Sequence, residues 1–175
     1  MKCIIVLPAI LFFIGCLSAK DHIPATEDES KEIRLAIIDS ARINVYEGLP
    51  HQMFEPELLA KESKRKDTKK IDSFRFYTPA VAATNPEDLK RILSSPNTIQ
   101  IFGGEKLCGG FHPDYAVEWF NTDGARFFAQ ICFGCHEIIY SDGRREFRYD
   151  FEDEPLEELK VELAPYAKKR PKDEG

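Results

Sequence analysis

The sequence lacks the features that would assign it to a common functional class. Its 175 residues contain no nucleophile-elbow or catalytic-triad motif. The Gly109-Gly110 pair is not followed by the lysine and helix of a phosphate-binding loop. Positive charge is in deficit, with 24 lysines and arginines against 30 acidic residues and a formal net charge of −6. Because a negative surface repels phosphate backbones, we expect no nucleic-acid partner.

Long apolar runs are also missing, and the one run present is short. Residues 3–14 are apolar apart from Pro8 and follow the positively charged Lys2. The run is well below the roughly 20 residues of a membrane-spanning helix. A charged residue followed by such a run is typical of a signal peptide. We therefore expect an exported protein.

The apolar run ends in a short motif around a cysteine. Phe13-Ile14-Gly15-Cys16 resembles the lipobox of bacterial lipoproteins, with phenylalanine where that family prefers leucine or another aliphatic residue. The resemblance implies that Cys16 is diacylated and anchors the chain to the membrane surface of the cell envelope. The alternative is cleavage after Ala19, which would give a soluble periplasmic or secreted protein. Either product works where thiols can oxidise.

The rest of the chain has the composition of a single folded domain. Hydrophobic residues make up 43% and aromatic residues 11% of the sequence, enough for a core. We expect a signal peptide over residues 1–15, a polar tether over 16–30, one domain over 31–170 and a disordered tail over 171–175, with fraying from Lys168 onward.

The hydrophobic pattern predicts an α+β fold. The segment 32–40 suits a helix or a buried strand, Pro56 and Asn85-Pro86 indicate helix starts, and Leu156 to Tyr166 has helical spacing. Asn85 is expected to cap its helix with its side chain. Apolar residues alternate in six segments, 43–46, 74–77, 99–101, 115–119, 127–131 and 147–151. We predict an antiparallel β-meander of about five strands, with helices packed on one face and the other face wet.

One hairpin gives the only clue to a functional site. If Asn121 pairs with Ala125 across the Thr122-Asp123-Gly124 turn, then Cys132 lies opposite Asp114. Cys and His side chains near these positions would then converge at one edge of the sheet. The candidate site residues are Cys108, His112, Cys132, Cys135 and His136.

Three interpretations of this cluster stay open. Cys132 to His136 matches the C-x-x-C-H pattern of c-type haem attachment, with His136 as the iron ligand. Alternatively, Cys108, Cys132, Cys135 and His112 or His136 bind zinc, provided that Gly134 turns the backbone through a positive φ. In the third interpretation, which we favour, Cys108 forms a disulfide with Cys132 or Cys135, contributing about 3 kcal/mol.

His51 is expected to be an exposed loop histidine, although the fold could bring it to the site. A general acid–base set of Asp114, Glu118, His136 and Glu137 is conceivable, but no spacing in the sequence requires it.

Three segments resemble a group of small exported bacterial proteins that are uncharacterised. They are Tyr46-Glu47-Gly48-Leu49-Pro50-His51-Gln52, Cys108-Gly109-Gly110-Phe111-His112-Pro113-Asp114-Tyr115 and Ile131-Cys132-Phe133-Gly134-Cys135-His136-Glu137. The resemblance implies export and nothing about activity. We expect a non-enzymatic binding or structural module of the cell envelope, with a zinc or haem redox or sensor protein as the alternative.

Overall fold

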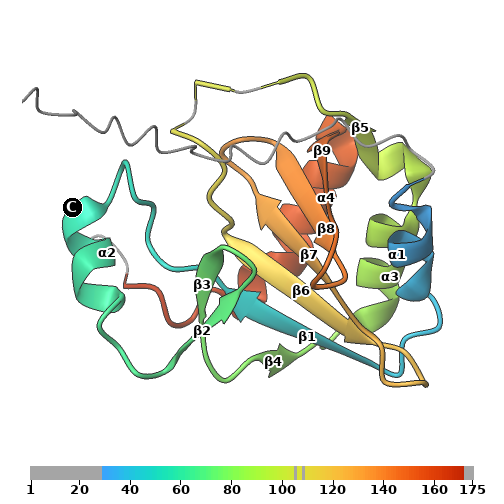
Figure 1. Cartoon of the computed structure of the whole chain (residues 1–175), viewed down its shortest axis with the longest axis horizontal. Helices are drawn as coiled ribbons and strands as arrows, with labels where there is room; N and C mark the ends of the chain where they lie inside the picture. Colours follow the sequence, from blue (N-terminus) through green and yellow to red (C-terminus); the bar gives the residue numbers. More distant parts are fainter. Residues whose placement is uncertain (1–28, 105, 108, 172–175) are drawn as a thin grey trace, which may run out of the picture.

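The computed structural model describes residues 29–104, 106–107 and 109–171, which form an α+β domain (Figure 1). The predicted signal peptide and Cys16 lie outside the described residues, as do most of the tether and residues 172–175 of the tail. No helix in the described ranges is long and apolar enough to cross a membrane. The helices are α1 (Lys31–Ala36), α2 (Pro56–Glu62), α3 (Pro86–Ser94) and α4 (Asp153–Leu163), with short 3-10 helices η1 (Pro96–Thr98) and η2 (Ala164–Tyr166). The strands are β1 (Arg42–Glu47), β2 (Thr68–Ile71), β3 (Phe74–Tyr77), β4 (Val81–Ala82), β5 (Ile99–Ile101), β6 (Tyr115–Phe120), β7 (Arg126–Cys132), β8 (Glu137–Ser141) and β9 (Glu146–Phe151).

The main sheet is an antiparallel meander extended at both edges. Its order is β4-β1-β6-β7-β8-β9-β5, so within the described residues this sheet has seven strands where the sequence predicted about five. Strands β6 to β9 follow one another in the chain and in the sheet. The predicted hairpin register is confirmed, because Tyr115 pairs with Ile131 and the backbone N–H of Asn121 donates to the carbonyl of Ala125 at 3.0 Å.

Helices α1, α3 and α4 pack on one face of this sheet, as predicted. Figure 1 shows α1 beside α3, with α4 behind the strands. Every second residue of β6 to β9 points into this layer and meets the apolar faces of α3 and α4. The fully buried side chains there include Trp119, Ile131 and Tyr140. The segment 32–40, open between helix and strand in the sequence, begins with helix α1.

The opposite face is buried too, so the predicted wet face is wrong. The β2–β3 hairpin lies in front of the sheet (Figure 1) and packs Ile71 and Phe76 against Tyr46, Ala116 and Phe128. The sequence does not reveal this cover, because β2 lies at the end of the basic run 61–70, whose charges are typical of a solvated loop. The end of the run instead forms a strand. Lys69 donates to Glu118 of the main sheet, and Ile71, two residues later, is buried.

Polar residues on this covered face have partners of their own. Glu118 is 2% exposed and accepts hydrogen bonds from the Tyr46 hydroxyl at 2.8 Å and the Lys69 ammonium at 3.3 Å. Glu137 is fully buried, and its Oε2 accepts from Nε of Arg148 at 2.7 Å. The Arg148 guanidinium also lies 4.2 Å from the ring centre of Phe102. Pairing of this kind is required because an isolated buried charge is strongly destabilising.

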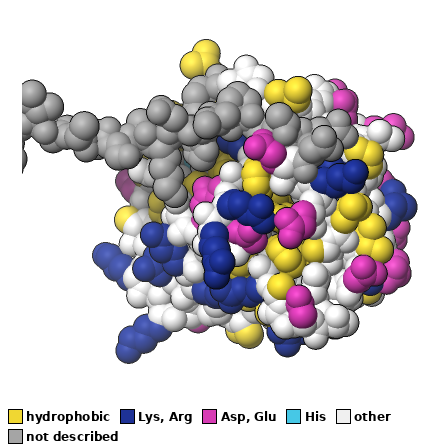
Figure 2. All heavy atoms as spheres, turned by 45° about the vertical axis from the view of Figure 1, so that its right-hand side comes forward, with side chains coloured by type: hydrophobic (Ala, Val, Ile, Leu, Met, Phe, Trp, Pro, Cys, Tyr) yellow, Lys and Arg dark blue, Asp and Glu magenta, His cyan; other side chains and the backbone are white. Residues whose placement is uncertain are grey.

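Smaller predictions at helix ends had mixed outcomes. Asn85 occupies the N-cap position of α3, but its side-chain nitrogen donates to Asp88 and makes no capping bond, so the predicted cap is wrong. Helix α4 ends at Leu163, two residues before Pro165, as expected from the missing N–H of proline. On the face that Figure 2 shows, basic side chains lie interspersed with acidic ones and are not gathered in a patch of one sign.

The buried Arg148–Glu137 pair gives a test of the fold. We expect Arg148→Met to lower the free energy of unfolding by about 3 kcal/mol, because it leaves the Glu137 carboxylate buried without its cation. Urea denaturation measures this change. The double variant Arg148→Met with Glu137→Leu is the control and should regain most of the lost stability. A double variant as unstable as the single one would show that the pair does not carry the effect.

Candidate functional site

Cys132 and Cys135 lie at the end of the β7–β8 hairpin. Cys132 is the last residue of β7 and pairs with Glu137, the first residue of β8, so residues 133–136 form the connecting turn. Asp114 precedes β6 on the neighbouring side, and its carboxylate accepts the backbone N–H of Phe133 at 2.8 Å. Cys132 therefore lies opposite Asp114, as the hairpin register predicted.

The turn is made differently from our expectation. Gly134 does not have a positive φ, whereas His136 does, with φ of 55°. The positive φ within this turn therefore falls on the residue after the second cysteine, not on the glycine between the two. The ammonium of Lys106 donates to the carbonyl oxygen of Cys135 at 2.8 Å and pairs with Asp150, also at 2.8 Å. The turn is thus held from the side by a cation.

The two cysteines are buried and hydrogen-bonded. They are 1% and 2% exposed. The backbone N–H of Cys135 donates to Sγ of Cys132 at 3.3 Å, and the Cys135 thiol donates to the carbonyl of Gly110 at 3.2 Å. Burial raises the pKa of the Cys132 thiol, and hydrogen bonds from Cys135 and from the His112 backbone partly oppose this rise. Cys132 is therefore a protonated thiol at neutral pH.

A second loop brings His51 to the same place. Gly48 approaches the segment before β6 so closely that a Cβ atom there would lie 2.1 Å from the carbonyl oxygen of Pro113. Its N–H donates to the carbonyl of Asp114 at 2.7 Å. This contact fixes the loop after β1 alongside His112, and the rings of His51 and His112 lie 4.7 Å apart between centres. The expectation that His51 is an exposed loop residue is wrong.

Both imidazoles are held in the neutral form. Burial, and then the neighbouring His51, lower the pKa of His112 to about 4, although hydrogen bonds to the carbonyls of His112 and Pro50 partly oppose this. Burial and the positive charge of Arg170 lower the pKa of His51. Nδ1 of His51 accepts the backbone N–H of Met53 at 3.0 Å. Nδ1 of His112 is buried and has no hydrogen-bond partner in the described part of the chain.

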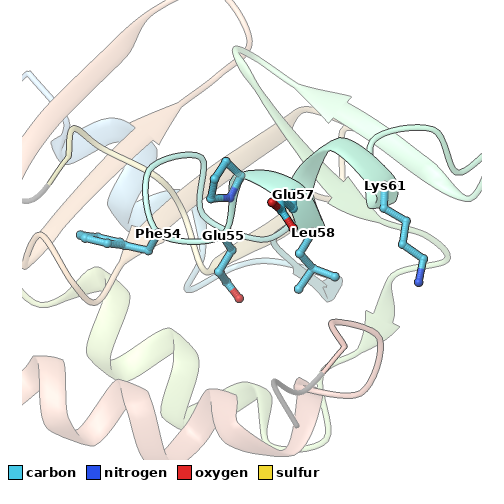
Figure 3. A pocket seen from close by; sticks show the side chains of 6 residues that line it. Phe54, Glu55, Glu57, Leu58 and Lys61 are labelled. Carbon is cyan, nitrogen blue, oxygen red and sulfur yellow. The ribbon is translucent and has the colours of Figure 1, made fainter. Parts of the chain in front are cut away.

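These groups line one cavity of about 510 Å³. Its charged members are Glu55, Asp114 and Arg170, and the arginine pairs with both acids, at 3.6 Å in the case of Asp114. Burial raises the pKa of the Asp114 carboxyl. The full lining is His51, Phe54, Glu55, His112, Asp114, Cys132, Gly134, Cys135 and Arg170. A shallower hollow of about 620 Å³ adjoins it along α2, where Figure 3 shows Phe54 and Glu55 at one end and Lys61 at the other.

Three cavity residues escaped the sequence analysis, namely Phe54, Glu55 and Arg170. Arg170 belongs to the segment that we expected to fray. The backbone N–H groups of Lys168 and Lys169 instead donate to the buried Glu47 carboxylate at 3.1 and 2.6 Å, which carries Arg170 to the cavity. The sequence shows only a run of three basic residues here, Lys168 to Arg170, which does not identify a partner.

The structure brings together three of the five predicted site residues. His112, Cys132 and Cys135 line the cavity, whereas Cys108 lies outside the described residues. His136 is not part of the lining: its side chain is half exposed and its Nδ1 lies 3.6 Å from Oδ1 of Asp153. In the parts of the chain that are described, no three His, Cys, Asp or Glu side chains lie close enough to hold a metal ion.

These positions bear differently on the three interpretations. A c-type haem requires the imidazole of the motif beside its thiols, but His136 turns toward α4. The zinc set that uses His112 retains its two described cysteines around one cavity. A disulfide with Cys108 involves a residue outside the described part. All three interpretations stay hypotheses.

Comparisons with protein-family models, curated proteins and solved structures gave no match. The chemistry of the site therefore has to be argued from its own geometry.

His112 provides a measurable test of the cavity. Its folded-state pKa of about 4 lies below the usual value of about 6.5, so the unfolded chain takes up the proton first on acidification. The contribution of His112 to the free energy of unfolding is thus complete above about pH 6.5 and falls as the pH drops toward 4, by less than about 1.4 kcal/mol per pH unit because the ring is partly exposed. An NMR titration of the imidazole C–H signals measures this pKa, and the His112 signal is identified by its absence from the His112→Gln variant. At pH 5 its chemical shift should still be that of a neutral imidazole. A midpoint at or above 6.5 for that signal would contradict the described burial.

Proposed function

We propose that this chain is an exported, lipid-anchored protein of the cell envelope and that its domain is a non-enzymatic binding module. The proposal has two parts, the place where the protein works and the site that it uses. The first part is supported by the charged start, the short apolar run and the lipobox-like motif ending at Cys16. The second part is supported by the cavity.

One observation carries the binding role: two neutral imidazoles and two buried thiols line the same cavity. The charged groups of the cavity are paired with one another, since Arg170 lies within ion-pair distance of Glu55 and Asp114. Lone pairs on nitrogen and sulfur are therefore what the cavity offers a ligand. A hydrolytic role is less well supported, because the His112 and His51 rings lie against each other and no nucleophile with an adjacent base is found among the described residues that line the cavity.

A second candidate makes the ligand a soft metal ion such as Zn²⁺. The buried Nδ1 of His112 favours it, because this is an imidazole nitrogen without a partner beside two thiols. Deprotonation of Cys135 would end its donation to the Gly110 carbonyl and release its sulfur toward a metal. The residues that would hold the ion are Cys132, Cys135 and His112. Their donor atoms would have to move together, since they do not converge as described.

Cys16 tests the proposed location. In a bacterial host, the full-length chain should be recovered in the membrane fraction, and the intact mass should show a diacylated N-terminal cysteine. Cys16→Ser should abolish acylation and either leave the precursor unprocessed or release the domain into the soluble envelope fraction. Cys3→Ser, within the apolar run, is the matched control and should leave the anchor intact. An unacylated soluble product cleaved after Ala19 in the unmodified chain would contradict the lipid anchor.

Zinc titration of the reduced protein tests the second candidate. We expect one Zn²⁺ per chain, with release of thiol protons. Cys132→Ser, Cys135→Ser and His112→Gln should each weaken binding at least about tenfold, which corresponds to 1.4 kcal/mol. His136→Gln changes a side chain outside the cavity and should bind like the unmodified protein. Stoichiometric zinc retained by the Cys132→Ser/Cys135→Ser variant, or no zinc bound by the unmodified chain, would end this candidate.

A further inference from the structure

The two cysteines of the β7–β8 turn are placed to react with each other. Sγ of Cys132 lies 3.3 Å from the backbone nitrogen of Cys135, so the first sulfur already touches the residue that carries the second. A disulfide needs Cα atoms about 4.4–6.8 Å apart. The first and last residues of a four-residue β-turn lie within about 7 Å of each other, and Cys132 and Cys135 have this spacing in the sequence. The bracing of the Cys135 carbonyl by Lys106 keeps the turn in this shape.

We propose that Cys132 and Cys135 are a redox-active pair that is converted reversibly into a disulfide by exchange with a small aliphatic disulfide. The Cys132 sulfur attacks one sulfur of the small disulfide, whose S–S bond breaks and releases one thiol. The Cys135 sulfur then attacks Cys132 in the mixed disulfide and releases the second thiol. Two electrons pass from the protein thiols to the small disulfide, and both thiol protons end on its two halves.

The hydrogen bonds assign the order of attack. The sulfur of Cys132 accepts a backbone N–H, a contact that stabilises the thiolate form. The Cys135 sulfur instead donates to the Gly110 carbonyl and needs its proton to do so. Cys132 is therefore the attacking residue and Cys135 the resolving one. Both cysteines are almost completely buried and line the cavity. A reagent therefore has to enter the cavity to reach them, which favours a small disulfide over a protein partner.

Oxidation also changes the cavity. The disulfide has no thiol proton, so the bond from Cys135 to the Gly110 carbonyl is lost. It also has no thiolate to offer a metal ion. If the proposed binding function holds, ligand binding by the cavity is therefore controlled by the redox state of this turn.

Peptide mapping tests the pair, because trypsin separates it from the third cysteine of the domain. Cleavage after Lys106, Arg126 and Arg144 gives peptide 107–126 with Cys108 and peptide 127–144 with Cys132 and Cys135. The reduced chain is treated with glutathione disulfide, blocked with iodoacetamide and digested. We expect peptide 127–144 to become lighter by two hydrogens, to carry no alkyl group and to be restored by dithiothreitol.

Single variants test the order of attack. Cys135→Ser should accumulate glutathione on Cys132, whereas Cys132→Ser should react at least about tenfold more slowly. His136→Gln, in the same turn, is the control and should oxidise like the unmodified chain. Alkylation of both Cys132 and Cys135 after treatment, or peptide 107–126 cross-linked to 127–144, would overturn the proposal. Zinc binding is measured on the reduced chain, so failure of the redox pair is distinguishable from failure of the binding function.

Discussion

The pairing of β6, β7 and β8 is the constraint on which the rest of this structure depends. A shift of one residue would transfer every side chain of a strand to the other face of the sheet. In the observed register, Cys132 faces Glu137 across one side of β7, and the residue before β6 is Asp114. The cysteine turn and the start of β6 therefore meet at the same end of the sheet. The cavity exists because the loop after β1 is also fixed there, through the close approach of Gly48 to Pro113.

Burial of the sheet on both faces explains much of the chemistry. Helices cover one face, and the β2–β3 hairpin covers the other, so polar side chains on the second face lie out of water. The carboxyl groups of Glu118 and Glu137 are paired there with Lys69 and Arg148, which compensates for the lost solvent. At the end of the sheet the same exclusion of water has a different effect. There burial lowers the pKa of His112 and raises the pKa of Cys132, so that both side chains are neutral.

Local pattern was sufficient for the meander and insufficient for the site. Two-residue alternation and the Thr122-Asp123-Gly124 turn determine the register of β6 and β7, because both act between residues close in the chain. His51 and Arg170 reach the cavity from segments that are far apart in the sequence, and neither has a periodic signal. The β2–β3 hairpin was missed for a related reason: its lysines resemble a solvated loop until a partner strand is known. His136 is part of the C-x-x-C-H motif in the sequence, but its side chain does not lie with the two cysteines. The backbone has a positive φ there, and the imidazole lies near Asp153 of α4.

The two thiols connect these observations. In an oxidising compartment, a buried cysteine pair has two stable fates, a disulfide or a bound soft metal, and both consume the same two sulfurs. The cavity is suited to each in a different state: a hydrogen bond from the Cys135 backbone favours thiolate on Cys132, while burial opposes it. The balance is therefore set by whatever enters the cavity. A cation brings the missing charge and favours two thiolates, whereas a small disulfide removes the protons together with the electrons. Burial therefore keeps the two thiols unreactive while the cavity is empty. They react only when a metal ion or a small disulfide enters it.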